Sequence, residues 1–196
     1  MASAQETGLE CLIHLDNVVM NQLVSSYKGN NYTVYNGQEV LFNLVEDTEG
    51  LSLLSGGSHR GFHMNGVDNF GRKVFSLRRP GMSISDKVEV FMHDQLVSVV
   101  RMESTFLTPV FSINDAHDCP VLRLKGKITD TSNYKLQTQS KTTIGSIHKK
   151  THDTLKDALS RKDDYAISFP GDLALNFKLA VIVASVLIDF RFHEYK

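Results

Sequence analysis

Short runs of alternating apolar and polar residues, separated by turn residues, occupy most of this chain. The clearest pair is residues 32–35 (YTVY) and 39–45 (EVLFNLV), which flank Asn36-Gly37. Asn-Gly tolerates a positive φ at both central positions of a tight turn, so this pair predicts an antiparallel hairpin. Runs rich in β-branched and aromatic residues, with turns between them, continue to residue 147.

The hydrophobic pattern therefore predicts a mainly β protein. The other predicted strands are residues 12–15, 18–23, 62–67, 73–77, 88–92, 96–102, 110–113, 121–124, 134–138, 143–147 and 166–169. About a dozen strands at this spacing are typical of a sandwich or a closed barrel. Residues 153–161 and the opening stretch are expected to be helical. No proline-rich linker divides the chain, so we expect one domain at 8–196 and a disordered tail at 1–7.

A second pattern, apolar on every face, covers residues 177–192 (FKLAVIVASVLIDFRF). Its uninterrupted part, 179–188, would rise about 15 Å as a helix, half the thickness of a bilayer core. A helix that is apolar all round is otherwise one surrounded by protein. The length favours a buried helix inside the β domain over a membrane span in a thinned bilayer. We expect Phe177, Val181, Val183, Leu187 and Phe190 to lie in the core.

Composition and charge narrow the class of protein. The chain has 196 residues with 41% hydrophobic content, and its 21 basic and 22 acidic residues leave a net charge of −1. No global field attracts it to nucleic acid or to an anionic bilayer, so any such attraction must be local. Two cysteines, Cys11 and Cys119, suit a reducing compartment. With neither a secretory signal nor a myristoylation motif at the start, we expect a cytoplasmic protein.

Several short motifs, taken in order along the chain, resemble the phospholipid scramblase family. They are residues 8–12 (GLECL), 46–47 (ED), 68–71 (DNFG), 79–80 (RP), 169–170 (FP), 172–173 (DL) and 187–190 (LIDF). That resemblance implies a fold similar to the tubby C-terminal domain, a closed antiparallel barrel of about twelve strands enclosing a hydrophobic C-terminal helix. The helix length and the strand count favour the same architecture.

The resemblance implies a function as well. It predicts passive, ATP-independent movement of phospholipids between membrane leaflets, with calcium as a cofactor and no covalent chemistry, so the protein is not expected to be an enzyme. The alternative is a soluble tubby-like adaptor that binds lipid headgroups or proteins without moving lipid. Expected partners are phospholipid membranes and proteins, with nucleic acid less favoured. The expected location is the cytosolic face of membranes, with the nucleus as a second compartment.

The resemblance places a calcium loop on residues 161–172. Calcium takes about six to eight oxygen ligands, and this segment offers only Asp163, Asp164 and Asp172 beside Arg161 and Lys162. A structural alternative is a strand whose Tyr165, Ile167 and Phe169 fill the core, followed by Asp172 as the N-terminal cap of the last helix.

Local basic residues are the candidates for lipid contact. Arg72, Lys73, Arg78 and Arg79 cluster in the sequence and would suit anionic headgroups. Basic residues on alternating strand positions are also ordinary solvent-facing side chains, and this second interpretation is favoured. The cysteine cluster that many relatives carry for palmitoylation has no counterpart at residues 80–87, so a covalent lipid signal is not expected there.

Overall fold

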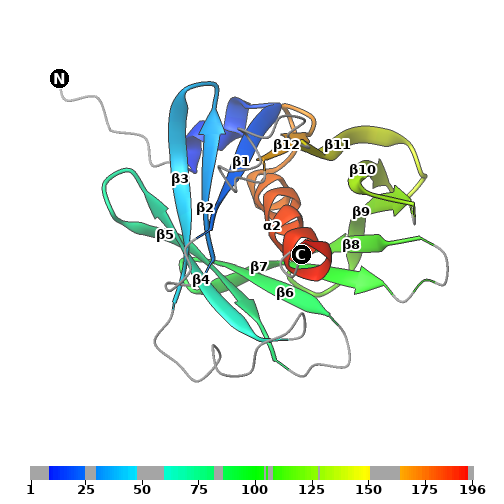
Figure 1. The fold of residues 1–196 in the computed structure, drawn as a ribbon, viewed down its shortest axis with the longest axis horizontal. Helices are drawn as coiled ribbons and strands as arrows, with labels where there is room; N and C mark the ends of the chain where they lie inside the picture. Colours follow the sequence, from blue (N-terminus) through cyan, green and yellow to red (C-terminus); the bar gives the residue numbers. More distant parts are fainter. Residues whose placement is uncertain are drawn as a thin grey trace.

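The computed structural model describes residues 9–24, 30–47, 60–81, 86–103, 105, 108–127, 129–150 and 164–193. The predicted tail at 1–7 and the predicted helix at 153–161 lie outside these ranges. Within them the fold is a closed antiparallel barrel of twelve strands with one long helix, α2, running through it (Figure 1). The predicted fold class is confirmed.

Each strand of the barrel pairs with its neighbours along the chain, and β1 closes the sheet against β12. The elements are η1 (Glu10–His14), β1 (Asn17–Val24), β2 (Asn30–Asn36), β3 (Glu39–Glu46), β4 (Phe62–Asp68), β5 (Lys73–Arg79), β6 (Lys87–Met92), β7 (Gln95–Glu103), β8 (Val110–Asn114), β9 (Pro120–Lys127), β10 (Asp130–Thr138), β11 (Thr143–Lys150), β12 (Asp164–Ser168) and α2 (Leu175–Phe192).

Strand alternation places one face of the sheet inside the barrel. In β4, for example, Phe62 and Met64 are buried while His63 between them is exposed. Tight hairpin turns join the strands where a positive φ is available, as at Gly37 and Gly71. Closure removes the free sheet edges that would otherwise invite pairing with another chain.

The predicted strand at residues 12–15 is wrong, because this segment forms the 3₁₀ helix η1. Leu12 is buried, whereas Ile13 and His14 are exposed. A four-residue apolar run is compatible with either structure, and both neighbours of β1 are already taken by β2 and β12. No edge is left for another strand beside β1.

The helix α2 forms the core of the barrel. Every residue from Lys178 to Phe190 is buried, and Val181, Val183, Leu187 and Phe190 are all 0% exposed. Phe177 is half-buried and packs against the same cluster. No helix among the described residues combines the length and the mean hydropathy that crossing a membrane requires.

Candidate functional site

The N-terminal part of α2 is held in place by a buried ammonium group. Lys178 is 0% exposed, and its Nζ lies 2.6–3.0 Å from four backbone carbonyl oxygens, which share its three N–H donors. These oxygens belong to Leu12, Ile13, Leu15 and Gly171. Burial lowers the pKa of Lys178, and the carboxylates of Asp172 and Asp16 oppose that shift. The carbonyl cage gives this buried cation the partners that it needs.

A buried carboxylate anchors the other end of the helix. Asp189 is 0% exposed and accepts hydrogen bonds from the hydroxyls of Tyr32, at 2.8 Å, and Tyr165, at 2.7 Å. These tyrosines come from β2 and β12, so the helix is joined to two strands by one side chain. Polar side chains near both ends of the apolar stretch therefore fix its position along the barrel.

Two buried arginines pack against the ring of Phe190. Arg60 forms a two-point ion pair with Glu46, and Arg79 donates from Nε to Asp86 at 2.8 Å. The guanidinium carbons of Arg60 and Arg79 lie 4.9 and 6.0 Å from the centre of the Phe190 ring. Each charge is paired and also contacts an aromatic face, which is how a guanidinium is kept in a core. This cluster stabilises the barrel and has little access to solvent.

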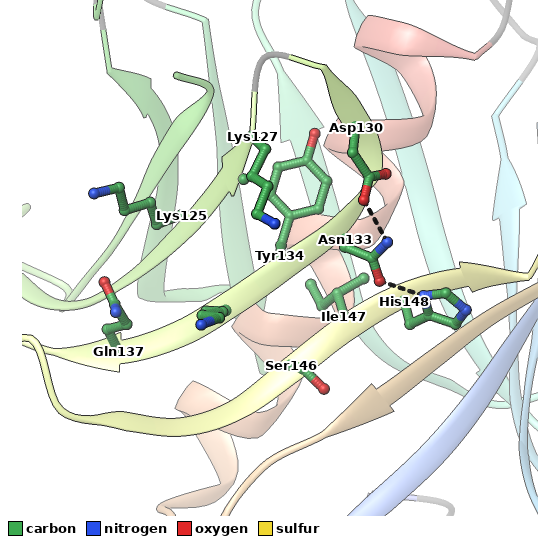
Figure 2. Close-up of a pocket in the computed structure, with 11 residues that line it drawn as sticks. Lys125, Lys127, Asp130, Asn133, Tyr134, Gln137, Ser146, Ile147 and His148 are labelled. Carbon is green, nitrogen blue, oxygen red and sulfur yellow. Dashed lines mark hydrogen bonds between the residues drawn. The ribbon is translucent and has the colours of Figure 1, made fainter. Parts of the chain in front are cut away.

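A pocket of about 480 Å³ lies at β9, β10 and β11 (Figure 2). Its charged lining consists of Lys125 and Lys127 from β9, Asp130 and Lys135 from β10, and His148 from β11. Three lysines face one aspartate, so the pocket is positive whether or not the histidine is protonated. Its volume is within the range of small-ligand sites.

An irregularity in strand pairing creates this pocket. Lys135 lies opposite Lys125, and Asp130 lies opposite Lys127, so four residues of β10 face only Gly126 of β9. The extra residues open the wall between the two strands, as a bulge does. The Lys125–Lys135 pair places like charges directly opposite each other, an arrangement that destabilises a sheet.

Tyr134 forms the floor of the pocket. It is 2% exposed, and its ring packs so closely on Gly126 that a Cβ added there would lie 2.7 Å from Cε1 of the ring. Its hydroxyl has no hydrogen-bond partner within the described part of the chain. Burial, together with the charge of Asp130, raises the pKa of Tyr134, so the hydroxyl stays protonated at neutral pH and remains a donor.

A chain of side chains orders the rim of the pocket. Asn133 donates from Nδ2 to Asp130 at 2.6 Å, and its Oδ1 contacts Nδ1 of His148 (Figure 2). The hydrogen bonds from Asn133 and from the Ser132 amide hold the pKa of Asp130 below its ordinary value. Asp130 is thus engaged by its own strand, while the three lysines carry no ion pair among the residues that the structure describes. The arrangement suits an anion with several acceptor oxygens.

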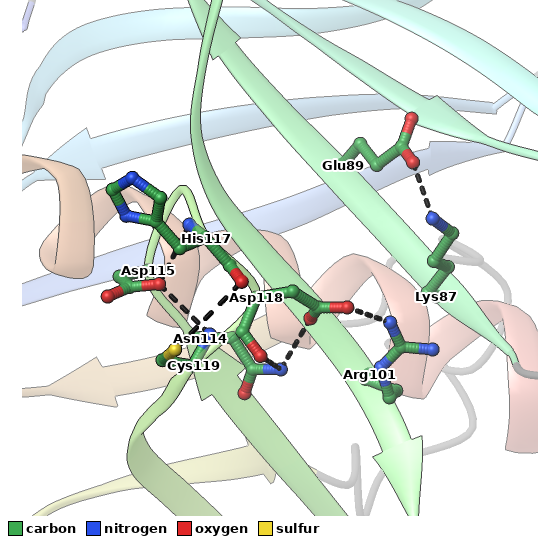
Figure 3. A network of polar contacts seen from close by, with 8 residues as sticks. All are labelled: Lys87, Glu89, Arg101, Asn114, Asp115, His117, Asp118 and Cys119. Carbon is green, nitrogen blue, oxygen red and sulfur yellow. Dashed lines mark hydrogen bonds and ion pairs between the residues drawn. The ribbon is translucent and has the colours of Figure 1, made fainter.

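The turn between β8 and β9 holds a second group of polar residues, but it does not resemble a binding site (Figure 3). Asp115 accepts from the amides of His117 and Cys119, while Asn114 and Arg101 both bind Asp118. Burial raises the pKa of Asp118, but the hydrogen bonds from Asn114 and Arg101 outweigh burial and leave it lowered. In the described ranges no three His, Cys, Asp or Glu side chains gather as a metal site. These contacts stabilise the turn.

A sequence profile of the family described as Scramblase matches residues 1–195. The chain belongs to the scramblase family. Phospholipid scramblase 2 from Bos taurus is 28% identical to it over 95% of this chain and 71% of that protein. Phospholipid scramblase 1 from Mus musculus is 28% identical over 95% of this chain and 64% of that protein, so this scramblase-family chain spans about two thirds of their length.

A solved structure supports the barrel of this scramblase-family chain. A crystal structure of a protein from Arabidopsis thaliana superposes with a TM-score of 0.52, covering 87% of this chain and 91% of that one. The two sequences are 18% identical. At that identity the likeness establishes a shared fold and leaves function to other observations.

Of the three predicted calcium residues, the structure describes two, Asp164 and Asp172. Asp163 lies outside the described residues. Asp164 begins β12, and Asp172 follows four residues after the end of that strand. The strand between them is about 13 Å long. Asp172 does not cap α2, which has Ala174 at its N-cap position.

The four predicted lipid-contact residues do not share one exposed surface. Arg72 is bound to Asp68, with hydrogen bonds from its backbone and from Nε, and Arg79 is 4% exposed and paired with Asp86. Lys73 and Arg78 are exposed on β5. Neighbours in the sequence are divided here because alternate strand residues point to opposite faces of the sheet.

Sequence reasoning missed the lysine pocket. A signal was present, because Lys125-Gly-Lys127 places two lysines on the same face of β9. The position of Lys135 beside them depends on the register between β9 and β10, and that register is set by the bulge. No local pattern in the sequence predicts a register that shifts by three residues.

Proposed function

We propose that this chain promotes the passive movement of phospholipids between the leaflets of a membrane, acting from its cytosolic face. The observation that carries the proposal is the match of the scramblase profile to residues 1–195. It is supported by relatives that are themselves called phospholipid scramblases. Such movement transfers lipid without making or breaking a covalent bond, so no catalytic residues are assigned.

Within this proposal the barrel is a rigid body that holds a headgroup-binding surface. The buried anchors at Lys178 and Asp189 fix the helix, and the closed sheet fixes the pocket at β9 to β11. A rigid scaffold of this kind positions charged side chains at a surface without a further change of shape. Calcium dependence stays a prediction, and it is tested below by comparing samples with calcium and with a chelator.

Reconstitution provides the test. The protein is incorporated into vesicles containing a fluorescent phospholipid, and dithionite is added to quench the outer leaflet. Movement predicts that fluorescence falls beyond the outer-leaflet fraction, with no nucleotide present. Parallel samples contain calcium or a chelator, and protein-free and heat-denatured samples serve as controls. A loss no faster than in protein-free vesicles, in both calcium arms, would overturn the proposal.

A second function is favoured by the enclosure of α2. Thirteen consecutive residues of this helix, from Lys178 to Phe190, are buried within the barrel. A protein that keeps its most apolar segment inside can bind headgroups at a membrane surface as an adaptor without transporting lipid. Co-sedimentation with vesicles separates the two functions: binding that depends on headgroup, together with no dithionite-accessible movement, supports the adaptor. Absence of binding to every lipid tested would contradict both.

A further inference from the structure

We infer that the pocket lined by Lys125, Lys127, Lys135 and Tyr134 binds the phosphate group of an anionic phospholipid headgroup. This inference rests on the proposed function for the source of the phosphate, but its chemistry rests on the pocket alone. Ammonium groups and a phenol hydroxyl are all hydrogen-bond donors, and a phosphate oxygen accepts from each of them.

The unpaired hydroxyl of Tyr134 is the first argument for a ligand. Buried polar side chains nearly always have a hydrogen-bond partner, and those without one need an explanation. Tyr134 is 98% buried, its hydroxyl has no partner within the described residues, and the residue lines the pocket. Figure 2 shows the hydroxyl directed toward the end of the pocket where Asp130 lies. A phosphate oxygen would supply the acceptor that the described residues do not provide there.

The opposed lysines are a second, independent argument. Lys125 and Lys135 occupy directly opposite positions on neighbouring strands, where like charges repel. A bound anion between them converts that repulsion into two attractions. Lys127 lies two residues from Lys125 on the same face of β9, so all three lysines belong to the lining of one pocket.

The glycine between the two β9 lysines explains how the floor is formed. Any side chain at residue 126 would collide with the Tyr134 ring and with Pro109, at 2.7 and 2.9 Å. Gly126 therefore allows the ring to lie under the gap between the strands, with its hydroxyl at the pocket. The sequence Lys-Gly-Lys thus supplies both the positive rim and the space for the tyrosine.

Two variants test the pocket without disturbing the fold. Lys125→Gln/Lys135→Gln removes the opposed charges, so it should be as stable as the wild type or more stable. Tyr134→Phe removes a hydroxyl that has no hydrogen-bond partner among the described residues, so its unfolding temperature should also be unchanged or raised. The matched control is Lys141→Gln/Lys150→Gln, which changes the net charge equally at exposed positions outside the pocket lining.

Binding is measured by co-sedimentation with phosphatidylcholine vesicles that either contain or lack phosphatidylserine. At about 1 kcal/mol for each lysine near a charged surface, the double lysine variant should bind the anionic vesicles about 30-fold more weakly. Tyr134→Phe should lose about tenfold, as expected for a hydrogen bond to a charged group. The control variant should lose less than about threefold. Equal losses in the control and the pocket variants would show generic surface attraction and overturn the inference.

The source of the phosphate is tested separately with inorganic phosphate and glycerol phosphate, titrated into the protein and followed by NMR. Weak binding of these probes, lost in both pocket variants, is expected beside tighter vesicle binding. Probes that bind as tightly as vesicles would assign the pocket to a soluble phosphate compound and refute the lipid source. Pocket-dependent vesicle binding without dithionite-accessible movement would refute transport and leave the pocket standing. If the pocket variants bind vesicles as well as the wild type and still move lipid, the inference about the pocket is refuted and the proposed transport is supported.

Discussion

The burial of α2 is most directly tested at its centre, where Val183→Asp introduces a carboxyl group. Val183 is 0% exposed, as are its neighbours Ile182 and Ala184. If the helix is the core of the barrel, this change should unfold the whole domain. If the helix instead served only as a membrane anchor, the protein would remain folded and would simply bind membranes less.

The size of the effect follows from the surroundings. Removing a fully buried valine side chain from the core costs about 1.5–3 kcal/mol. A new aspartate with an ordinary pKa near 4 must be neutralised at pH 7 to enter this core, which costs about 4 kcal/mol. Burying the neutral carboxyl without a partner adds about 1–3 kcal/mol. The total of about 6–10 kcal/mol is comparable with the entire stability of a typical domain.

Urea unfolding followed by circular dichroism, with gel filtration of the same samples, measures this outcome. The control variants are Val183→Ala, expected to fold with a loss of about 2–3 kcal/mol, and Gln139→Asp, an exposed turn position expected to be neutral. We expect Val183→Asp to lack a cooperative transition and to elute as an expanded or aggregated species. A folded Val183→Asp protein with wild-type stability would refute the placement of α2 in the core.

Three further predictions concern single positions. Lys178→Met should lower the free energy of unfolding by about 2–5 kcal/mol, because four backbone carbonyls lose their shared donor; a wild-type urea midpoint would contradict the carbonyl cage. Burial raises the pKa of Asp68, but hydrogen bonds from Arg72 and the Phe70 amide outweigh burial and leave the pKa below 3.8. The ionised carboxylate therefore stabilises the fold above that pH, and this stabilisation is lost as the pH falls. The difference in unfolding free energy between wild type and Asp68→Asn should shrink between about pH 5 and pH 2. A difference that stays constant over this range would contradict the lowered pKa. Gly145→Ala should cost about 1–3 kcal/mol in the same urea assay, because a Cβ there would lie 2.2 Å from the backbone oxygen of Ser168; an unchanged midpoint would mean that the strands adjust freely.

Much of the fold could be predicted because its signals are local. The Asn36-Gly37 turn, the alternation within strands such as β4 and the all-round apolar helix each depend on residues near one another. The helix length favoured burial over a membrane span, since a bilayer core needs about 20 apolar residues. Where a local signal was ambiguous, as at residues 12–15, the prediction failed and the available pairing edges decided the structure.

The predicted site residues depended on neighbours that the sequence does not identify. Arg79 looks like an exposed strand cation, yet it is enclosed by Asp86 and Phe190. Asp164 and Asp172 are close in sequence, yet a strand separates them. For Arg79 the deciding factor is which face of the sheet its side chain occupies, and for the two aspartates it is the extended strand between them.

By itself, the sequence determined the β class, the hairpin order, the enclosed helix and the family, because periodicity, turn chemistry and ordered motifs are written in consecutive residues. Only the tertiary structure decided what satisfies Lys178 and Asp189, and which cations remain exposed. It alone brought Lys135 opposite Lys125 and left the Tyr134 hydroxyl without a hydrogen-bond partner in the described ranges. These features arise from strand register and barrel closure, which are set by long-range packing and which place residues far apart in the chain within contact distance.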